Sequence, residues 1–418
     1  MPTSPLQRSP RISQRTWIIT GLAVGLLSVL VACFIWNRTD PEASFQRGLN
    51  AVAKRDVPAL HREVQILRRF PKYGPQIQLL RGTIFLAGEN LQSAIHEFDL
   101  CSVHPATRVR ALTLAGEVFS RQGRHQDAQR VLQHALTFDP RWVDAHRWLA
   151  IAYYDTGSSP LAIEELRTVA ELDPLDYRPH RLMGLIHKDN EQFAQAVQDY
   201  RATLRLAPQQ PSREEVLLEL SQSLTKLHRY DEALKFLEQA QDSADTWACR
   251  ATCEFGLGRQ NQARLAAVKV IELSPNHLDG LLTLGTLEAE AGRLAQAAQY
   301  LERAVKSHPQ DFTAPFKLSG VYQRMGRAVE AKEQMQRMEV NRKLREKFTD
   351  LHEAANARPQ DASVRYELGE TARQLKLLHL AKMWYQAALA LNPKHDKARQ
   401  ALKNLKIPAG ETGQLSTP

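Results

Sequence analysis

The sequence predicts an all-α solenoid of about ten helix-turn-helix repeats behind one apolar N-terminal helix. Three observations predict this fold. Alanines recur at intervals close to 34 residues along most of the chain, each belongs to an apolar stripe with helical spacing, and most units close on a proline. Two short helices cannot bury their apolar faces alone, so each unit needs a neighbour of the same kind.

Residues 278 to 309 form one complete unit. Its first helix carries apolar residues at i, i+3 and i+4 and its second at i, i+4 and i+7, which gives each helix one buried face. Gly285 and Ala297 have almost no side chain, so the two helices can approach closely where they cross, and Leu301 fills the space beside them. Gly292 marks the turn, and a proline ends the unit.

The alanine near the start of each second helix marks the register of the units. It occurs at Ala59, Ala94, Ala128, Ala162, Ala196, Ala233, Ala263, Ala297, Ala331 and Ala381. A small residue in the first helix, an aromatic three positions later in several units (Phe85, Phe119, Tyr153, Tyr322) and the closing proline repeat in the same register. Over residues 41 to 406 this pattern resembles the tetratricopeptide repeat (TPR) family. Together with the apolar N-terminal helix, it suggests a membrane-anchored TPR protein of bacterial type. The resemblance implies a right-handed superhelical solenoid whose first helices line a concave groove for protein or peptide partners.

The N-terminal region predicts a membrane anchor. Residues 1 to 16 are rich in Ser, Pro and Arg and predict a disordered basic tail. Residues 17 to 36 lack charged residues, and a helix of that length, at about 1.5 Å per residue, spans a hydrocarbon layer of roughly 30 Å. Arginines before this segment favour a cytoplasmic N-terminus and an extracytoplasmic, periplasmic TPR domain. A cleaved signal peptide, a buried core helix, and a lipid anchor at Cys33 within a lipobox-like sequence are the alternatives.

The predicted units follow one another with two irregular junctions. Their expected bounds are 41–71, 75–105, 109–140, 143–174, 177–208, 214–243, 244–275, 278–309, 312–359 and 362–393, then a capping helix at 395–406 and a flexible tail at 407–418. The loop at residues 208–215 is longer than the others, and the junction at residues 241–245 is shortened. These changes indicate either tolerated loop variation or a hinge.

The interval of 50 residues between Ala331 and Ala381 predicts one long helix. No Gly or Pro interrupts the sequence from Arg327 to about Asn356. Its broken apolar stripe, interrupted by Asn341, either packs on the last repeat or projects as a second interface for dimerisation or a partner. That second interface would use Met338, Leu344, Phe348 and Leu351.

The expected partner groove is basic. Groove positions inferred from the resemblance are Arg110, Arg121, Arg147, Trp148, Tyr154, Arg178, Arg181 and Lys188. Guanidinium groups beside aromatic rings suit an acidic or C-terminal peptide, because arginine pairs bidentately with carboxylates. A solvated arginine face is the alternative. The asparagines of a chaperone-binding carboxylate clamp are absent from these positions.

The sequence offers little for catalysis or nucleic-acid binding. The formal charge is +9, but the basic residues are dispersed and no nucleic-acid motif occurs. No phosphate-binding loop, nucleophile elbow or zinc motif is present, so we expect neither an enzyme, a cofactor nor a metal site. Cys249 with Cys253, and His180 with His187, are interpreted as packing residues.

We therefore expect a membrane-anchored protein-protein interaction scaffold or adaptor in cell-envelope assembly, secretion or maturation. A lipid-anchored TPR lipoprotein and a non-catalytic accessory subunit of an envelope enzyme are the alternatives. A second copy of the chain is a further candidate partner.

Overall fold

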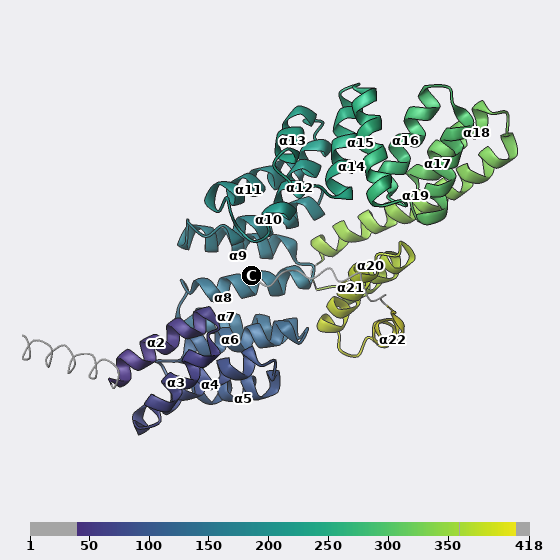
Figure 1. Cartoon of the computed structure of the whole chain (residues 1–418). Coiled ribbons are helices and arrows are strands. Elements are labelled where there is room, and N and C mark those ends of the chain that lie inside the picture. The colour runs from purple at the N-terminus through teal and green to yellow at the C-terminus, as the bar shows by residue number, and fades with distance from the viewer. Residues whose placement is uncertain (1–39, 359, 407–418) are drawn as a thin grey trace, which may run out of the picture. The chain divides into compact units, whose positions relative to one another are not determined.

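The computed structural model describes residues 40–358 and 360–406. They form 21 α-helices and one short 3-10 helix, with no strand among them, which confirms the all-α prediction (Figure 1). The predicted basic tail, membrane segment with Cys33, closing Pro359 and C-terminal tail lie outside the described residues.

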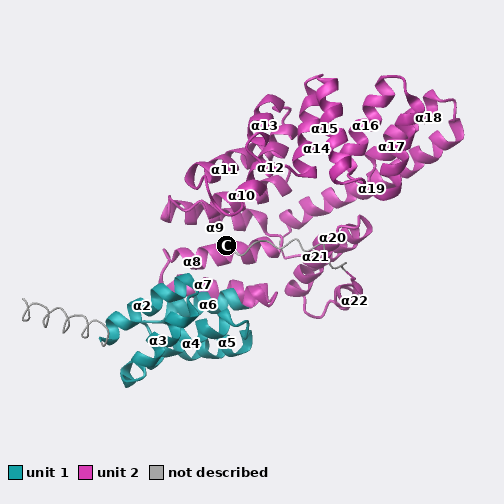
Figure 2. Ribbon diagram, viewed as in Figure 1, with its two compact units in different colours: residues 1–118 teal, residues 119–418 magenta. Residues whose placement is uncertain are grey.

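The chain divides into two compact units, residues 1–118 and 119–418 (Figure 2). The first unit contains, in order, α2 (Pro41–Lys54), α3 (Val57–Leu67), η1 (Pro71–Tyr73), α4 (Gly74–Ala87), α5 (Leu91–Ser102) and most of α6 (Arg108–Arg121). Within it, α2 packs on α3 and α4 packs on α5. These are two of the helix pairs that the repeat predicts.

The second unit continues the same pairing. Its helices are α7 (His125–Phe138), α8 (Val143–Asp155), α9 (Ser159–Leu172), α10 (Arg178–Asp189), α11 (Phe193–Leu206), α12 (Arg213–Lys226), α13 (Tyr230–Leu237), α14 (Ala244–Gly256), α15 (Gln260–Leu273), α16 (Leu278–Glu290), α17 (Leu294–Ser307), α18 (Thr313–Arg324), α19 (Ala328–Ala357), α20 (Ala362–Gln374), α21 (Leu378–Leu391) and α22 (Asp396–Asn404). From α8 onward, each even-numbered helix up to α20 pairs with the next, and each pair stacks on the following one. The last helix, α22, packs on α21.

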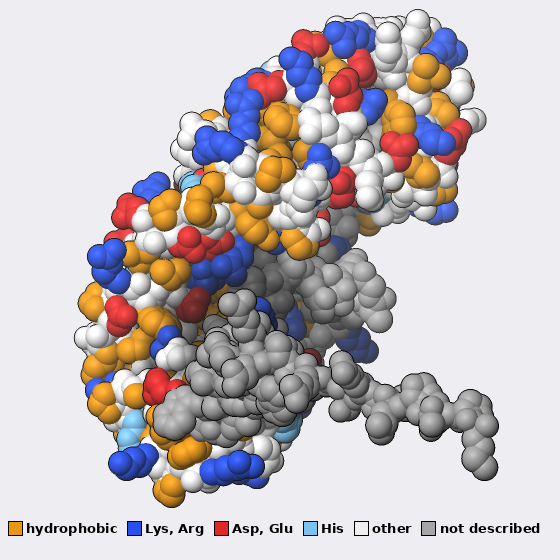
Figure 3. Space-filling view, turned by 60° about the vertical axis from the view of Figure 1, so that its left-hand side comes forward, with side chains coloured by type: hydrophobic (Ala, Val, Ile, Leu, Met, Phe, Trp, Pro, Cys, Tyr) orange, Lys and Arg blue, Asp and Glu red, His pale blue; other side chains and the backbone are white. Residues whose placement is uncertain are grey.

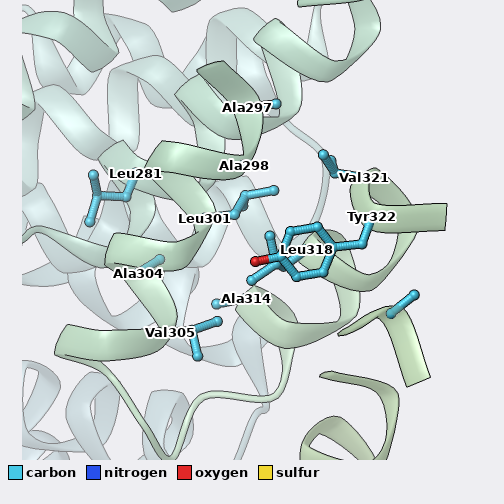
Figure 4. Close-up of a cluster of buried hydrophobic side chains, with 11 residues drawn as sticks. Leu281, Ala297, Ala298, Leu301, Ala304, Val305, Ala314, Leu318, Val321 and Tyr322 are labelled. Carbon is cyan, nitrogen blue, oxygen red and sulfur yellow. The ribbon is translucent and has the colours of Figure 1, made fainter. Parts of the chain in front are cut away.

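Small residues set the distance between the helices of a pair. A Cβ added to Gly285 of α16 would lie 2.6 Å from Cγ of Leu301 on α17, so only glycine permits this approach. Gly184 of α10 would meet the ring of Tyr200 in the same way, at 2.7 Å. The buried cluster in Figure 4 then continues from Leu301 into Leu318 of α18, so one core joins consecutive repeats.

The shortened interval before Ala263 arises within a helix. The second helix α13 has 8 residues, whereas α11 and α15 have 14 each. A capping box between Ser243 and Thr246 then starts α14 at once. The interval is therefore short because α13 is a shorter helix than its counterparts, and not because a loop is shorter.

The expected long helix is present as α19, with 30 residues. Asn341, which interrupts its apolar stripe, is buried, and its side-chain amide donates to the carbonyl oxygens of Pro309 and Asp311 at 3.0 and 2.9 Å. Farther along, Phe348 and Leu351 pack against a cluster that contains Leu368 and Trp384. The apolar stripe therefore packs on the last repeat at its C-terminal end.

Candidate functional site

The predicted groove residues lie on three first helices. Arg110 and Arg121 belong to α6, which crosses the boundary between the compact units, and the other six lie on α8 and α10 within the second unit. On α8 the structure places Arg147, Trp148 and Tyr154, and Trp148 is half-buried.

Arg147 is buried and forms ion pairs within the chain. Its guanidinium pairs with Asp144 one turn earlier and with Asp176 at 2.8 Å. Arg178 pairs with Asp176 as well, also at 2.8 Å. Burial alone would raise the pKa of Asp176, but the hydrogen bonds and charge of Arg178, with the charge of Arg147, lower it. Arg147 therefore links α8 to the loop before α10, and Arg178 pairs with the same carboxylate within the start of α10.

The remaining polar groups of this face bind the next repeat. Arg181 pairs with Glu215 at 2.9 Å, and Lys188 pairs with Glu219 at 2.7 Å, so α10 is tied to α12. The hydroxyl of Tyr154 donates to Asp189 at 2.8 Å. Each of the four predicted cations on α8 and α10 thus forms an ion pair with an Asp or Glu of the chain. Whether they also bind an acidic partner stays a prediction.

Opposite charges are also interspersed over the surface. On the face shown in Figure 3, Lys and Arg side chains alternate with Asp and Glu rather than forming one stripe. On this face, the distribution gives no continuous track for a phosphate backbone.

A pocket that the sequence analysis missed lies between the first helices α16 and α18. Its volume is about 220 Å³, and it is lined by Gly285, Thr286, Ala289, Leu301, Lys317, Gly320, Val321 and Arg324. Leu301 comes from the second helix of the pair. A Cβ added to Gly320 would have no atom within 4 Å, so the space beside this glycine is open.

The surroundings of the α16–α18 pocket combine apolar and cationic groups. Phe316 is 55% exposed and lies one helical turn before Gly320 on the same face. Arg324 donates to the carbonyl of Ala289 at 2.7 Å, and burial lowers the pKa of Lys317. The sequence signal that could have predicted this pocket is the pair of small residues Ala289 and Gly320 on neighbouring first helices.

A second pocket, of about 490 Å³, lies between α20 and α22. Its cationic lining residues are Arg373, Lys376, Lys397 and Lys406. Arg373 pairs with Glu370 at 2.9 Å. This pocket belongs to the capped C-terminal end.

The histidine pair and the cysteine pair noted in the sequence contact polar side chains of the chain. Asp199 lies 2.7 Å from Nδ1 of His187 and 3.5 Å from Nδ1 of His180. Burial would raise the pKa of Asp199, but the two neighbouring histidines lower it, His187 through a hydrogen bond. Cys249 and Cys253 are buried beside Thr225. Within residues 40–358 and 360–406, no cluster of three or more His, Cys, Asp or Glu is arranged to hold a metal ion.

Comparison with known families gives the identity of the repeat. Tetratricopeptide repeat models match residues 120–186 and 288–339, residues 181–246, and residues 362–395, together just over half of the chain. The chain belongs to the tetratricopeptide repeat family. TPR domains bind protein or peptide partners, and TPR proteins are generally non-catalytic scaffolds.

Several solved structures are similar to this TPR chain. A TPR protein from Parabacteroides merdae shares 18% identity, with a TM-score of 0.40 over 59% of this chain and 98% of that chain. Pseudomonas aeruginosa pilF shares 19%, with a TM-score of 0.41 over 50% and 96%. PilW, a type IV pilus biogenesis factor, shares 15%, with a TM-score of 0.41 over 48% and 93%. No curated protein matches the sequence.

Among the described residues, none of the helices combines the length and the apolar content that a membrane crossing needs. The predicted membrane segment, residues 17 to 36, is not among them.

Proposed function

We propose that this TPR protein is a membrane-anchored scaffold or adaptor that docks a segment of a partner protein on its first helices, in cell-envelope assembly, secretion or maturation. The α16–α18 pocket carries the proposal. Its small walls and the apolar floor at Leu301 accept one apolar side chain, while the exposed ring of Phe316 extends the contact. Lys317 and Arg324 line it and can contact carbonyl or carboxylate oxygens of the bound segment.

The mechanism is binding without chemistry. Because the repeats on both sides hold α16 and α18, the pocket is formed before the partner arrives, and little conformational entropy is lost on docking. An anchor at residues 17 to 36 would confine the encounter to the membrane surface and raise the effective concentration of a partner held there.

Filling the pocket tests the proposal. We expect Gly320→Leu to abolish capture of the partner by the full-length protein from its native membranes, because the new side chain occupies the open space beside the glycine. The fold should be kept, since leucine is the better helix former by about 0.5 kcal/mol or more. Gln299→Leu, on an exposed position of α17, is the matched control and should leave capture unchanged. Equal capture by all three proteins would show that the pocket is not the docking site.

Topology needs a separate measurement. With the arginines before residue 17 in the cytoplasm, a cysteine placed after Pro408 should react with a membrane-impermeant thiol reagent added outside the inner membrane. Protection of that cysteine in intact spheroplasts would contradict the extracytoplasmic orientation. A lipid on Cys33, detected by mass spectrometry and lost in Cys33→Ser, would replace the transmembrane anchor by the lipoprotein alternative.

The competing class is an accessory subunit of an envelope enzyme. Turnover by the purified full-length protein that Gly320→Leu removes would instead indicate a catalytic protein whose site uses no recognised motif, and would overturn the scaffold.

A further inference from the structure

One turn in the second unit is buried where its counterparts are exposed. The three residues between α8 and α9, Thr156 to Ser158, and the first residue of α9, Ser159, are all buried. Corresponding turns of later repeats place Gly258, Gly292 and Gly326 on the surface. Turns of this kind lie at the edge of a stack of helix pairs, so another element must cover the α8–α9 turn.

The last repeat covers it. Nε of Arg365 on α20 donates to the carbonyl of Thr156 at 3.1 Å, across 209 residues of sequence. The ring of Trp384 on α21 lies against Gly157, where an added Cβ would be 2.2 Å from Cζ3. Helix α21 also contacts α7, and Figure 1 draws α20 and α21 beside α8.

The turn is shaped for this contact. Gly157 has φ +69°, and the residues around it are Thr and Ser, so neither a Cβ nor a long side chain keeps the indole away. Gly292 occupies the same place in its repeat with φ +76°, and an added Cβ there would have nothing within 4 Å. The two glycines share a backbone conformation, but only Gly157 has a tryptophan packed against it.

The docked repeat also brings the end of α19 toward the first helices. His352 packs edge-to-face on Trp384, with ring centroids 5.7 Å apart. Burial lowers the pKa of His352, while the charge of Asp189, at the end of α10, opposes this shift. The end of α19 is thus near enough to Asp189, which accepts the hydrogen bond from the predicted groove residue Tyr154, for the two charges to interact.

Arg365 favours opening of the contact between α20 and the α8–α9 turn. Arg365 is 1% exposed, and its guanidinium donates to the carbonyls of Thr156, Arg358 and Asp361. Among the described residues, no carboxylate forms an ion pair with it. Burial lowers the pKa of Arg365, and the charge of nearby Asp361 offsets only part of this effect. The guanidinium has therefore lost more through its hydration than its neutral oxygen partners and Asp361 return, and it regains water when the repeat undocks.

We propose that α20 and α21 form a reversible clasp on the α8–α9 turn, and that opening of this clasp regulates entry of the partner segment to the first helices of the second unit. This regulation rests on the proposed scaffold function. The clasp itself can be measured without a partner.

Hydrogen exchange on the full-length protein tests the clasp. In the wild type, amides of the α8–α9 turn and of α20 should exchange together and at least tenfold faster than those of α16. Gly157→Ala should accelerate exchange in α20 and α21 at least tenfold further, because its Cβ meets Trp384. Gly292→Ala carries the same backbone strain and should leave α20 and α21 unchanged. Equal effects of the two variants, or wild-type exchange no faster than in α16, would overturn the clasp.

Whereas Gly157→Ala should accelerate hydrogen exchange, Arg365→Met should slow it. It removes the buried charge while keeping an unbranched chain, so we expect exchange at the α8–α9 turn to slow at least threefold. Faster exchange would overturn the reversible clasp. The partner captured by the wild type should associate faster with Gly157→Ala and more slowly with Arg365→Met. Unchanged association in both variants would overturn the regulatory role, whereas the Gly320→Leu result tests docking by itself.

Discussion

Single arginines on α8 and α10 hold consecutive repeats together. Arg147 is buried between Asp144 and Asp176, and Arg181 reaches Glu215 on the next first helix. The two ion pairs differ in exposure, since Glu215 is largely in water whereas Asp176 is 8% exposed. Their contributions to stability should therefore differ.

Removing Arg147 should destabilise the second unit. Arg147→Ala leaves the buried Asp176 with one cationic partner instead of two and should lower the free energy of unfolding by about 3 kcal/mol. Urea unfolding of the full-length protein, followed by tryptophan fluorescence, measures this loss. Arg181→Ala, at the exposed pair, is the matched control and should cost about 0.5 kcal/mol. A loss equally small for Arg147→Ala would mean that its ion pairs are dispensable.

Part of this pairing could have been predicted from the sequence. Arg181 and Glu215 are 34 residues apart, one full repeat, so opposite charges at the repeat interval were a usable signal. The buried stripe residues were predicted because apolar spacing alone places Leu281 and Leu301 in the core. The partners of Arg147 depended on the loop conformation before α10, which no local pattern specifies.

Among the elements, α19 departs most from the repeat. Its length was predictable because no Gly or Pro interrupts it, but its packing was not. Asn341 interrupts the apolar stripe in the sequence, and in the structure it fastens the helix to the loop before α18 through two hydrogen bonds. The polar Asn341 on the apolar face of α19 thus attaches this helix to the loop before α18.

Removing this attachment should loosen α19. Asn341→Ala leaves the carbonyls of Pro309 and Asp311 without their donor and should cost about 2 kcal/mol. Hydrogen exchange in α18 and the first half of α19 measures the change, which should exceed tenfold. Gln336→Ala, on an exposed position of the same helix, should stay within about 0.5 kcal/mol. Similar exchange in both variants would remove Asn341 from its assigned role.

For the molecule as a whole, the sequence predicted what is local and periodic. Repeat number, helix pairing and the all-α class follow from contacts between residues within one or two units. The docking of α20 and α21 on the α8–α9 turn has no periodic signal, because Arg365 and Thr156 are 209 residues apart. The α16–α18 pocket was not predicted, because the predicted groove was defined by charged residues, whereas the space in this pocket comes from small residues such as Gly285, Ala289 and Gly320.

The central claim is that this TPR protein binds its partner through the α16–α18 pocket. The most direct test is the affinity of the full-length protein for the partner segment mapped by capture, measured by calorimetry for the wild type, Gly320→Leu and Gln299→Leu. We predict affinity at least tenfold weaker for Gly320→Leu, a loss of about 1.4 kcal/mol or more, and no change for Gln299→Leu. Equal affinity of Gly320→Leu and the wild type would contradict the claim.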